Sequence, residues 1–261
     1  MCVNIFQGIL SKMPLYEKCG IPYYGSEREG DQFDESDVAI WTAGGGFARR
    51  WNERGQKVGN HMTLCQKAAE LNKPIMDIAV GPGLGLLPDI FAINPELQAL
   101  ATDACPILVE KWSEFLQKQA PDTNIQFACF NAADMPIRDN SVDVITSNIG
   151  FSSLRYAGIG QMDGVKEAYR VLKPGGYIFT IENEFEDTAV VQKVFDLWGK
   201  ENWFRENKLE WSQRFRQCGF AIEEETFHQR RIENTDWELG EAAASFGLEI
   251  AMVFKGFVLR K

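Results

Sequence analysis

Three glycines at alternate positions, Gly81, Gly83 and Gly85, are the residues in this sequence best suited to bind a ligand through the main chain. Glycine has no Cβ, so the backbone can adopt angles that other residues avoid and can approach a ligand closely. An apolar run over residues 75–80 precedes them, and a helix-like pattern follows. A buried strand, a tight glycine turn and a helix N-terminus are the parts that cradle a nucleotide-like ligand.

The spacing of the glycines separates two classes of ligand. A dinucleotide site needs the pattern G-x-G-x-x-G, in which the last glycine lets the helix pack closely on the strand. Here Leu86 stands at the place of that last glycine, and the acid Asp77 lies inside the strand. The spacing therefore disfavours a dinucleotide, although a tight turn with only a structural role also accounts for the glycines.

The sequence around the turn resembles the S-adenosylmethionine (SAM) loop of the class I, Rossmann-like methyltransferases. The resemblance begins with DIAVGPGLG and continues in order from Pro74 to about Phe185. ATDACP is similar to the end of the family's second strand, and NAADMPIRDNSVDVITSNIGF to the stretch after its third. EAYRVLKPGGYIFTIEN is similar to the family's helix, Lys-Pro-Gly-Gly turn and fifth strand. One such match is weak, but four in sequence indicate a SAM-binding protein of this family.

The resemblance implies a role at the cofactor for a set of residues. Asp103 is expected to accept hydrogen bonds from the ribose hydroxyls, which a carboxylate does more strongly than a neutral group. Asp134 is expected to meet the adenine amino group, with Met135 packed on the adenine face. Asp77 is expected to orient the loop or to meet the methionine end of SAM. The other residues implied at the cofactor are Ala79, Gly81, Pro82, Gly83, Gly85, Ala104, Ala133, Asn148 and Ile149.

Each of these roles also has a purely structural alternative. Asp103 can cap the helix that follows it, and Asp134 can be a turn residue. Met135 can fill the core, and Asp77 can be a buried acid satisfied by loop amides. The sequence leaves these alternatives open.

One position departs from the family pattern. The family often shows an acid followed by glycines at every second position, and counting from Asp77 places Ala79 where the first glycine belongs. Alanine is small enough for a ligand to approach closely, so we expect it to be tolerated. This holds only if the position does not need a positive φ, which alanine resists.

Methyl transfer from SAM is an in-line displacement at a carbon that the sulfonium already activates, and it yields S-adenosylhomocysteine. The protein mainly aligns the reactants and excludes water. A general base is needed only where the acceptor must lose a proton. The candidate bases are His61, Glu182, Glu184 and Tyr156. His61 is the foremost of them, although a lone histidine is more often a packed or surface residue. Asn148, after the fourth strand, can line the acceptor pocket or form a strand-end turn.

Aromatic residues outside the cofactor motifs are candidates to enclose the acceptor. Those expected in a lid or at the substrate are Tyr23, Tyr24, Trp41, Tyr156 and Trp203. Those expected either in the acceptor wall or in the core are Phe195, Trp198, Trp203, Phe204 and Trp211.

The order of the predicted elements places these residues in an α/β fold. We expect strands within 75–80, 98–102, 124–130, 142–147 and 177–181, with helices between them, and two further strands within 220–232 and 248–259. This alternation predicts a doubly wound, mostly parallel seven-stranded sheet with an antiparallel C-terminal edge strand. Residues 1–72 are expected to form a helical and irregular cap or lid, and residues 73–261 the SAM-binding catalytic domain.

Composition disfavours several classes of protein. With 261 residues and a net charge of −10, the chain lacks the clustered basic surface of nucleic-acid-binding proteins. No apolar run is long enough to cross a bilayer, and the N-terminus lacks a signal-peptide pattern. Six scattered cysteines and two histidines predict no metal site and a reducing, cytoplasmic location.

The leading hypothesis is a cytoplasmic SAM-dependent methyltransferase for a small molecule. The alternatives are an NAD(P)-dependent oxidoreductase and a non-catalytic SAM-binding protein on the same fold, since fold and function can part. The sequence does not distinguish an oxygen, nitrogen, sulfur or carbon acceptor, and it leaves the oligomeric state open.

Overall fold

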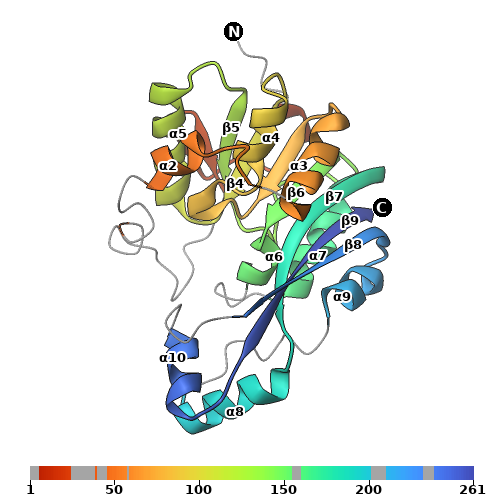
Figure 1. Cartoon of the computed structure of the whole chain (residues 1–261). Coiled ribbons are helices and arrows are strands. Elements are labelled where there is room, and N and C mark those ends of the chain that lie inside the picture. Colours follow the sequence, from red (N-terminus) through yellow and green to blue (C-terminus); the bar gives the residue numbers. More distant parts are fainter. Residues whose placement is uncertain are drawn as a thin grey trace.

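The computed structural model describes residues 6–24, 39, 46–57, 59–154, 160–200, 210–231 and 238–261, without the side chains of residues 7 and 228–231. Its centre is a mixed β-sheet with helices on both faces (Figure 1). Over these residues the sheet has nine strands, in the order β1-β2-β5-β4-β3-β6-β7-β9-β8. The predicted α/β fold with a doubly wound, mostly parallel sheet is confirmed.

Five parallel strands form the middle of the sheet. They are β3 (Ile75–Ile78), β4 (Ala99–Asp103), β5 (Ile125–Cys129), β6 (Val142–Asn148) and β7 (Leu172–Phe185). Strands β4 and β5 lie on one side of β3, and β6 and β7 on the other. The boundary between β3 and β6 is therefore the switch point at which open α/β sheets bind their ligands.

The two C-terminal strands, β8 (Ala221–Arg231) and β9 (Ala251–Arg260), form the predicted antiparallel edge of the sheet. Strand β9 runs antiparallel between β7 and β8, so the antiparallel C-terminal strand is internal and β8 forms the edge. Burial gives the physical reason. β9 is buried along most of its length, whereas β8 carries the exposed charged run 223–225, which suits an edge.

A hairpin of β1 (Tyr16–Lys18) and β2 (Ile21–Tyr23) raises the number of strands above the predicted seven. Strand β2 pairs with β5 at one register position. The Tyr23 hydroxyl and the Lys18 ammonium both donate to the Glu110 carboxylate, at 2.9 and 2.7 Å. Each strand has only three residues, which is too short to give a periodic signal in the sequence.

Two layers of helices cover the sheet. One face carries α2 (Gly46–Asn52), α3 (Asn60–Glu70), α4 (Leu87–Ile93) and α5 (Pro106–Gln119). The other face carries α6 (Gly150–Ser153), α7 (Gln161–Val171) and α9 (Trp211–Gln217). Short 3₁₀ turns, η1 (Gln7–Ile9) and η3 (Gly81–Gly83), complete this part of the chain. Within the ranges described, no helix is long and apolar enough to cross a membrane.

A third apolar cluster lies apart from the two faces. Strands β7 and β9 lead to α8 (Thr188–Trp198) and α10 (Glu238–Ser245), which Figure 1 shows at a distance from the other helices. The residues packed between these elements include Phe185, Phe195 and Met252, and we call this group the satellite cluster. Because β7 runs parallel to β6 and continues past its end, the satellite cluster lies beyond the carboxyl ends of the parallel strands.

Tyr23→Phe tests the bond that fastens the hairpin to α5. Tyr23 is only 2% exposed, and without its hydroxyl the Glu110 carboxylate loses a donor. We expect the free energy of unfolding to fall by about 1–2 kcal/mol, as measured by chemical denaturation. Tyr16→Phe is the matched control, because Tyr16 is exposed and keeps its ring stacking on Tyr23. Equal stability of the wild type and Tyr23→Phe would contradict the prediction.

Candidate active site

The predicted cofactor residues meet at one edge of the sheet, where strands β3 to β6 end. Because these strands run in the same direction, the residues that follow them lie beside one another across the switch point. Those that remain partly exposed are Ala79, Gly81, Gly83, Asp103, Ala104, Ala133, Asn148 and Ile149.

The glycine turn is open at its first two glycines and packed at its third. Among the described residues, a Cβ built on Gly81 or Gly83 meets no atom within 4 Å. A Cβ on Gly85 would lie 2.2 Å from Oδ1 of Asp77. Gly81 and Gly83 therefore leave room for a ligand beside the main chain, whereas Gly85 makes room for a buried carboxylate. Pro82, between the open positions, is exposed.

The backbone of this region is strained. Ala79 has a φ of +51°, so the condition under which we expected alanine to be tolerated is not met. Leu84 (+54°) and Ile149 (+63°) are also left-handed, which is uncommon for residues with a Cβ and rarest for β-branched ones. Each such residue costs roughly 1–2 kcal/mol, and the conformation persists where surrounding contacts hold it. The strain therefore falls at and beside the positions predicted to face the cofactor.

Asp77 is fully buried beneath the turn. Its Oδ2 accepts hydrogen bonds from the Leu86 amide (3.0 Å) and the Thr146 hydroxyl (2.7 Å), whereas Oδ1 has no partner among the described residues. Burial raises the pKa of Asp77 to about 7. Of the two roles predicted for Asp77, these contacts favour orientation of the loop over contact with the methionine end.

Asp103 joins the glycine turn to the next strand and helix. Its Oδ2 accepts a hydrogen bond from the Gly81 amide (2.8 Å), and its Oδ1 accepts one from the Cys105 amide (2.9 Å), just before α5. A carboxylate oxygen can accept more than one hydrogen bond, so bonds to these two amides do not exclude bonds to the hydroxyls of a diol. The predicted cofactor role and the predicted capping role are therefore compatible.

The stretch after β5 differs in part from the prediction. Asp134 is exposed and pairs with Lys12 at 2.9 Å. Met135 is 1% exposed and belongs to an apolar cluster on the sheet, so its side chain fills the core and does not present itself to an adenine. The Met135 amide donates to Glu167 of α7 (2.8 Å), which holds this part of the chain against that helix. The role of Asp134 stays a prediction.

Glu182 holds the segment after β6 in place. Its fully buried carboxylate accepts hydrogen bonds from the amides of Phe151 and Ser152 and from the hydroxyls of Ser152 and Thr180. Burial raises the pKa of Glu182 to about 7. Since four donors surround it, Glu182 is an anchor for α6, and its predicted role as a base is disfavoured. Asn148 stays partly exposed at the end of β6.

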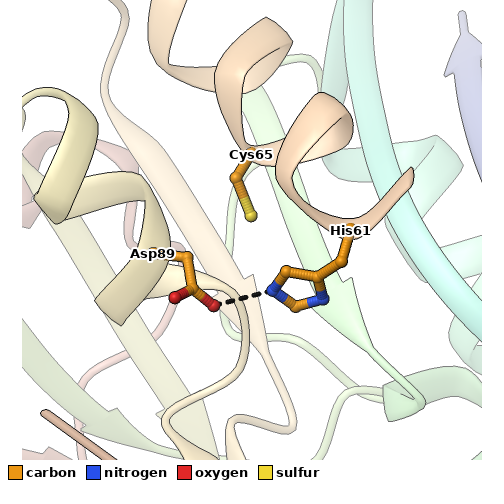
Figure 2. Close-up of side chains that lie close together, drawn as sticks. All are labelled: His61, Cys65 and Asp89. Atoms are coloured by element: carbon orange, nitrogen blue, oxygen red, sulfur yellow. Dashed lines mark hydrogen bonds and ion pairs between the residues drawn. The ribbon is translucent and has the colours of Figure 1, made fainter. Parts of the chain in front are cut away.

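His61 lies in an ion-pair network. Figure 2 shows its imidazole directed at Asp89, with Nε2 2.7 Å from Oδ2. Arg50 pairs with the same carboxylate oxygen at 2.7 Å. Glu184, another predicted base, pairs with Lys255 at 2.5 Å. These contacts explain both residues without a catalytic role, so a base at either position stays a prediction.

His61, Cys65 and Asp89 are also close enough to share a metal ion, with one ligand atom of each within 4.8 Å of the others (Figure 2). Arg50 and Lys57, however, place cationic nitrogens 2.7 and 3.9 Å from the Asp89 carboxylate, and these would repel a dication. Burial raises the pKa of the Cys65 thiol, which disfavours the thiolate that a metal requires. We therefore interpret this cluster as an ion-pair network.

The predicted lid and wall residues divide into three groups. Tyr23 is a buried residue of β2, so it belongs to the sheet and not to a lid. Tyr24 follows it and packs edge-on against Phe130. The aromatic residues of the C-terminal half that prove to be core residues are Phe195 and Trp211, with Trp198 partly buried beside the satellite cluster. Those outside the described residues are Trp41, Tyr156, Trp203 and Phe204.

Comparison with known proteins finds a match over the stretch that carries this site. Residues 78–180 match the family model described as a methyltransferase domain. A curated relative from Dinoroseobacter shibae, named ubiquinone/menaquinone biosynthesis C-methyltransferase UbiE, is 27% identical over 154 residues. That match covers 59% of this chain and 56% of the relative. The chain therefore spans about half the length of the curated relatives it matches.

Solved structures share the fold at lower identity. An arsenic(III) S-adenosylmethionine methyltransferase from Chlamydomonas reinhardtii is 15% identical, with a TM-score of 0.54, over 81% of this chain and 73% of that one. The [4+2]-cyclase SpnF is 16% identical, with a TM-score of 0.53, over 77% of this chain and 80% of that one. At these identities the likeness shows the fold alone, and the name of the second protein shows that the fold does not fix the reaction.

Glu182→Gln tests how the buried Glu182 carboxyl makes the stability of the protein depend on pH. Because the folded-state pKa of about 7 exceeds the ordinary value of 4.5, the folded protein binds one more proton than the unfolded chain between these pH values. Unfolding then releases a proton, so the contribution of Glu182 to the free energy of unfolding falls as pH rises from 4.5 to about 7. The free energy of unfolding of the wild type minus that of the variant should therefore fall by up to about 3 kcal/mol between pH 4.5 and 7.

Chemical denaturation of both proteins at several pH values between 5 and 8 measures this difference. Other titrating groups, Asp77 included, contribute equally to both proteins and cancel. Parallel stability curves would show that the Glu182 carboxyl does not change its proton affinity on folding.

Proposed function

We propose that this chain, which carries a methyltransferase domain over residues 78–180 on a Rossmann-like sheet, is a SAM-dependent methyltransferase acting on a small-molecule acceptor. The products are the methylated acceptor and S-adenosylhomocysteine. One observation carries the proposal. The glycine turn between β3 and α4 leaves room beside its main chain at Gly81 and Gly83, and Asp103 fixes it from the neighbouring strand.

The residues around the turn fit SAM. Asp103 is our candidate for the ribose hydroxyls, because a carboxylate accepts their hydrogen bonds more strongly than a neutral group. The open main chain at residues 81–83 suits the methionine part, which a side chain would exclude. Asp134 is our candidate for the adenine amino group. It would exchange its exposed ion pair with Lys12 for that bond, at little cost because exposed pairs contribute only about 1 kcal/mol or less.

The chemistry that this chain must supply is mainly alignment. SAM, when bound, brings a methyl group that its sulfonium has already activated for displacement. Asn148, at the end of β6 across the switch point from the turn, is our candidate to border the acceptor, and Ile149 beside it is a candidate to contact the cofactor. Among the described residues, the predicted bases are either buried among donors or held in ion pairs. This arrangement favours an acceptor that is already nucleophilic.

We also propose a cytoplasmic location, without a nucleic acid or a membrane as partner. Among the cysteines that the structure describes, Cys19, Cys65 and Cys218 are free thiols, which is typical of a reducing compartment. The net charge of −10 opposes binding to the phosphates of nucleic acid.

A second candidate function is SAM binding without methyl transfer. The family model and the relative described above give this candidate no support, and it is kept only because one fold can serve different functions. The NAD(P)-dependent alternative has no support in the family model or in the relative described above.

Asp103→Ala tests the cofactor site. Without the carboxylate, the ribose loses its acceptor and the Gly81 amide loses its partner, so we expect the Kd for S-adenosylhomocysteine to rise about 100-fold or more. Isothermal titration calorimetry measures this, with NAD as the control ligand that the wild type should not bind. Unchanged affinity in the variant, with its melting temperature preserved, would remove Asp103 from the site.

Label transfer tests the reaction. A small-molecule extract incubated with the protein and with SAM carrying a ¹³C-methyl group should yield a labelled product together with S-adenosylhomocysteine. The ¹³C chemical shift of the transferred methyl identifies the acceptor atom as carbon, nitrogen, oxygen or sulfur. Tight SAM binding with no labelled product from a broad set of extracts would favour the non-catalytic alternative.

A further inference from the structure

Two carbonyl groups of the glycine turn are held by side chains from two helices on the same face of the sheet. The indole Nε1 of Trp112, in α5, donates to the Gly81 carbonyl (3.2 Å). The Nε of Arg50, in α2, donates to the Gly83 carbonyl (3.1 Å). Phe47 of α2 packs on the Trp112 ring, with the ring centroids 4.3 Å apart. Helix α2 therefore supplies one of the two side chains that hold the turn and packs against the other.

Asp89 fixes the direction of Arg50. Its fully buried carboxylate accepts hydrogen bonds from Nη2 at 2.7 Å and from Nη1 at 3.4 Å, while Nε remains on Gly83. This two-sided contact suits arginine and not lysine, which has a single nitrogen. Burial alone would raise the pKa of Asp89, but hydrogen bonds from His61, Arg50 and Gly55 hold it well below its usual range. Asp89 is therefore ionised at neutral pH.

The partners of Asp89 among the described residues come from one short stretch of chain. Besides Arg50 they are the Gly55 amide (2.8 Å), the Lys57 ammonium (3.9 Å) and the His61 imidazole (2.7 Å, Figure 2). We call these four partners of Asp89 (Arg50, Gly55, Lys57 and His61) the N-terminal clasp. The clasp belongs to the segment predicted as a cap, whereas Asp89 lies in the first turn of the helix that follows the cofactor turn.

We infer that the N-terminal clasp is part of the cofactor site, with Arg50 as a positioning residue that sets the affinity of the turn for SAM. The inference rests on the proposed function of that turn. Its physical reason is the strained backbone, since the left-handed conformations of Ala79 and Leu84 persist only under outside restraint. Without Arg50, the turn is less ordered before binding, and part of the binding free energy of SAM is spent on ordering it.

The coupling is reciprocal. If docking of the clasp raises the affinity for SAM, then bound SAM stabilises the docked clasp by the same free energy. The clasp and the cofactor turn are in this way one thermodynamic unit, although the clasp falls in the predicted cap (residues 1–72) and the turn in the predicted catalytic domain (residues 73–261).

Calorimetry with S-adenosylhomocysteine tests the role of Arg50. Arg50→Met removes both of its contacts, and Arg50→Lys retains a charge for Asp89 without also reaching Gly83. We expect each variant to raise the Kd about tenfold or more, which corresponds to the loss of one charge-assisted hydrogen bond. Melting temperatures without ligand separate a loss of folding from a loss of affinity, and Arg50→Lys is expected to melt close to the wild type.

Arg54→Met is the matched control. Arg54 lies in the same segment, but it stacks on Trp51 and donates to the Trp51 carbonyl (2.8 Å), away from the turn. Its substitution removes the same charge, and the Kd is expected to stay within about twofold of the wild type. An equal loss in Arg54→Met, or wild-type affinity in Arg50→Lys, overturns the inference.

Hydrogen exchange on the wild-type protein tests the coupling without any substitution. On addition of S-adenosylhomocysteine, we expect the amides of residues 46–57 to become protected together with those of residues 81–87. Protection confined to the turn overturns the inference. A wild type that binds no S-adenosylhomocysteine refutes the proposed function itself, so the two failures are distinguishable.

Discussion

Three carboxylates hold the turn between β3 and α4, and the rest of the site depends on that restraint. Asp77 bonds to the end of the turn, Asp103 bonds to Gly81, and Asp89 acts on the turn through Arg50. Each restrains a different point of the turn, whose left-handed residues Ala79 and Leu84 are energetically costly. A ligand that binds along such a main chain meets a surface already ordered, so less conformational entropy is lost on binding.

Two buried aspartates beside the turn have pKa values shifted in opposite directions. Asp77 and Asp89 are both fully buried and lie at either end of the turn. With a hydroxyl and an amide as partners, burial dominates and the pKa of Asp77 rises to about 7. With a guanidinium, an imidazole and an amide as partners, the pKa of Asp89 falls below its usual range. At Asp89 the hydrogen-bonding and charged partners outweigh the effect of burial on the pKa, whereas at Asp77 they do not.

The sequence predicted the parts of the site that local pattern encodes. The strand, the glycine turn and Asp103 are close in sequence and follow known spacings, and they lie where we expected them. The support from Arg50 was not predicted, because its bond to Asp89 spans 39 residues and depends on how two helices pack. The only local signal was an acid within the apolar start of α4. The antiparallel C-terminal edge was predicted, but the order of β9 and β8 within it was not, since strand order is set by long-range pairing.

The satellite cluster has a consequence for how the protein can change. Among the described residues, it shares no member with the two clusters that flank the sheet, and the extended strands β7 and β9 link it to them. A region with its own small core opens at a lower free energy than the whole molecule, as a separate cooperative unit. Sequence drift in α8 and α10 therefore alters the region beyond the strand ends while the cofactor turn keeps its shape. Substitutions can therefore accumulate in the satellite cluster without changing the contacts that hold the cofactor turn.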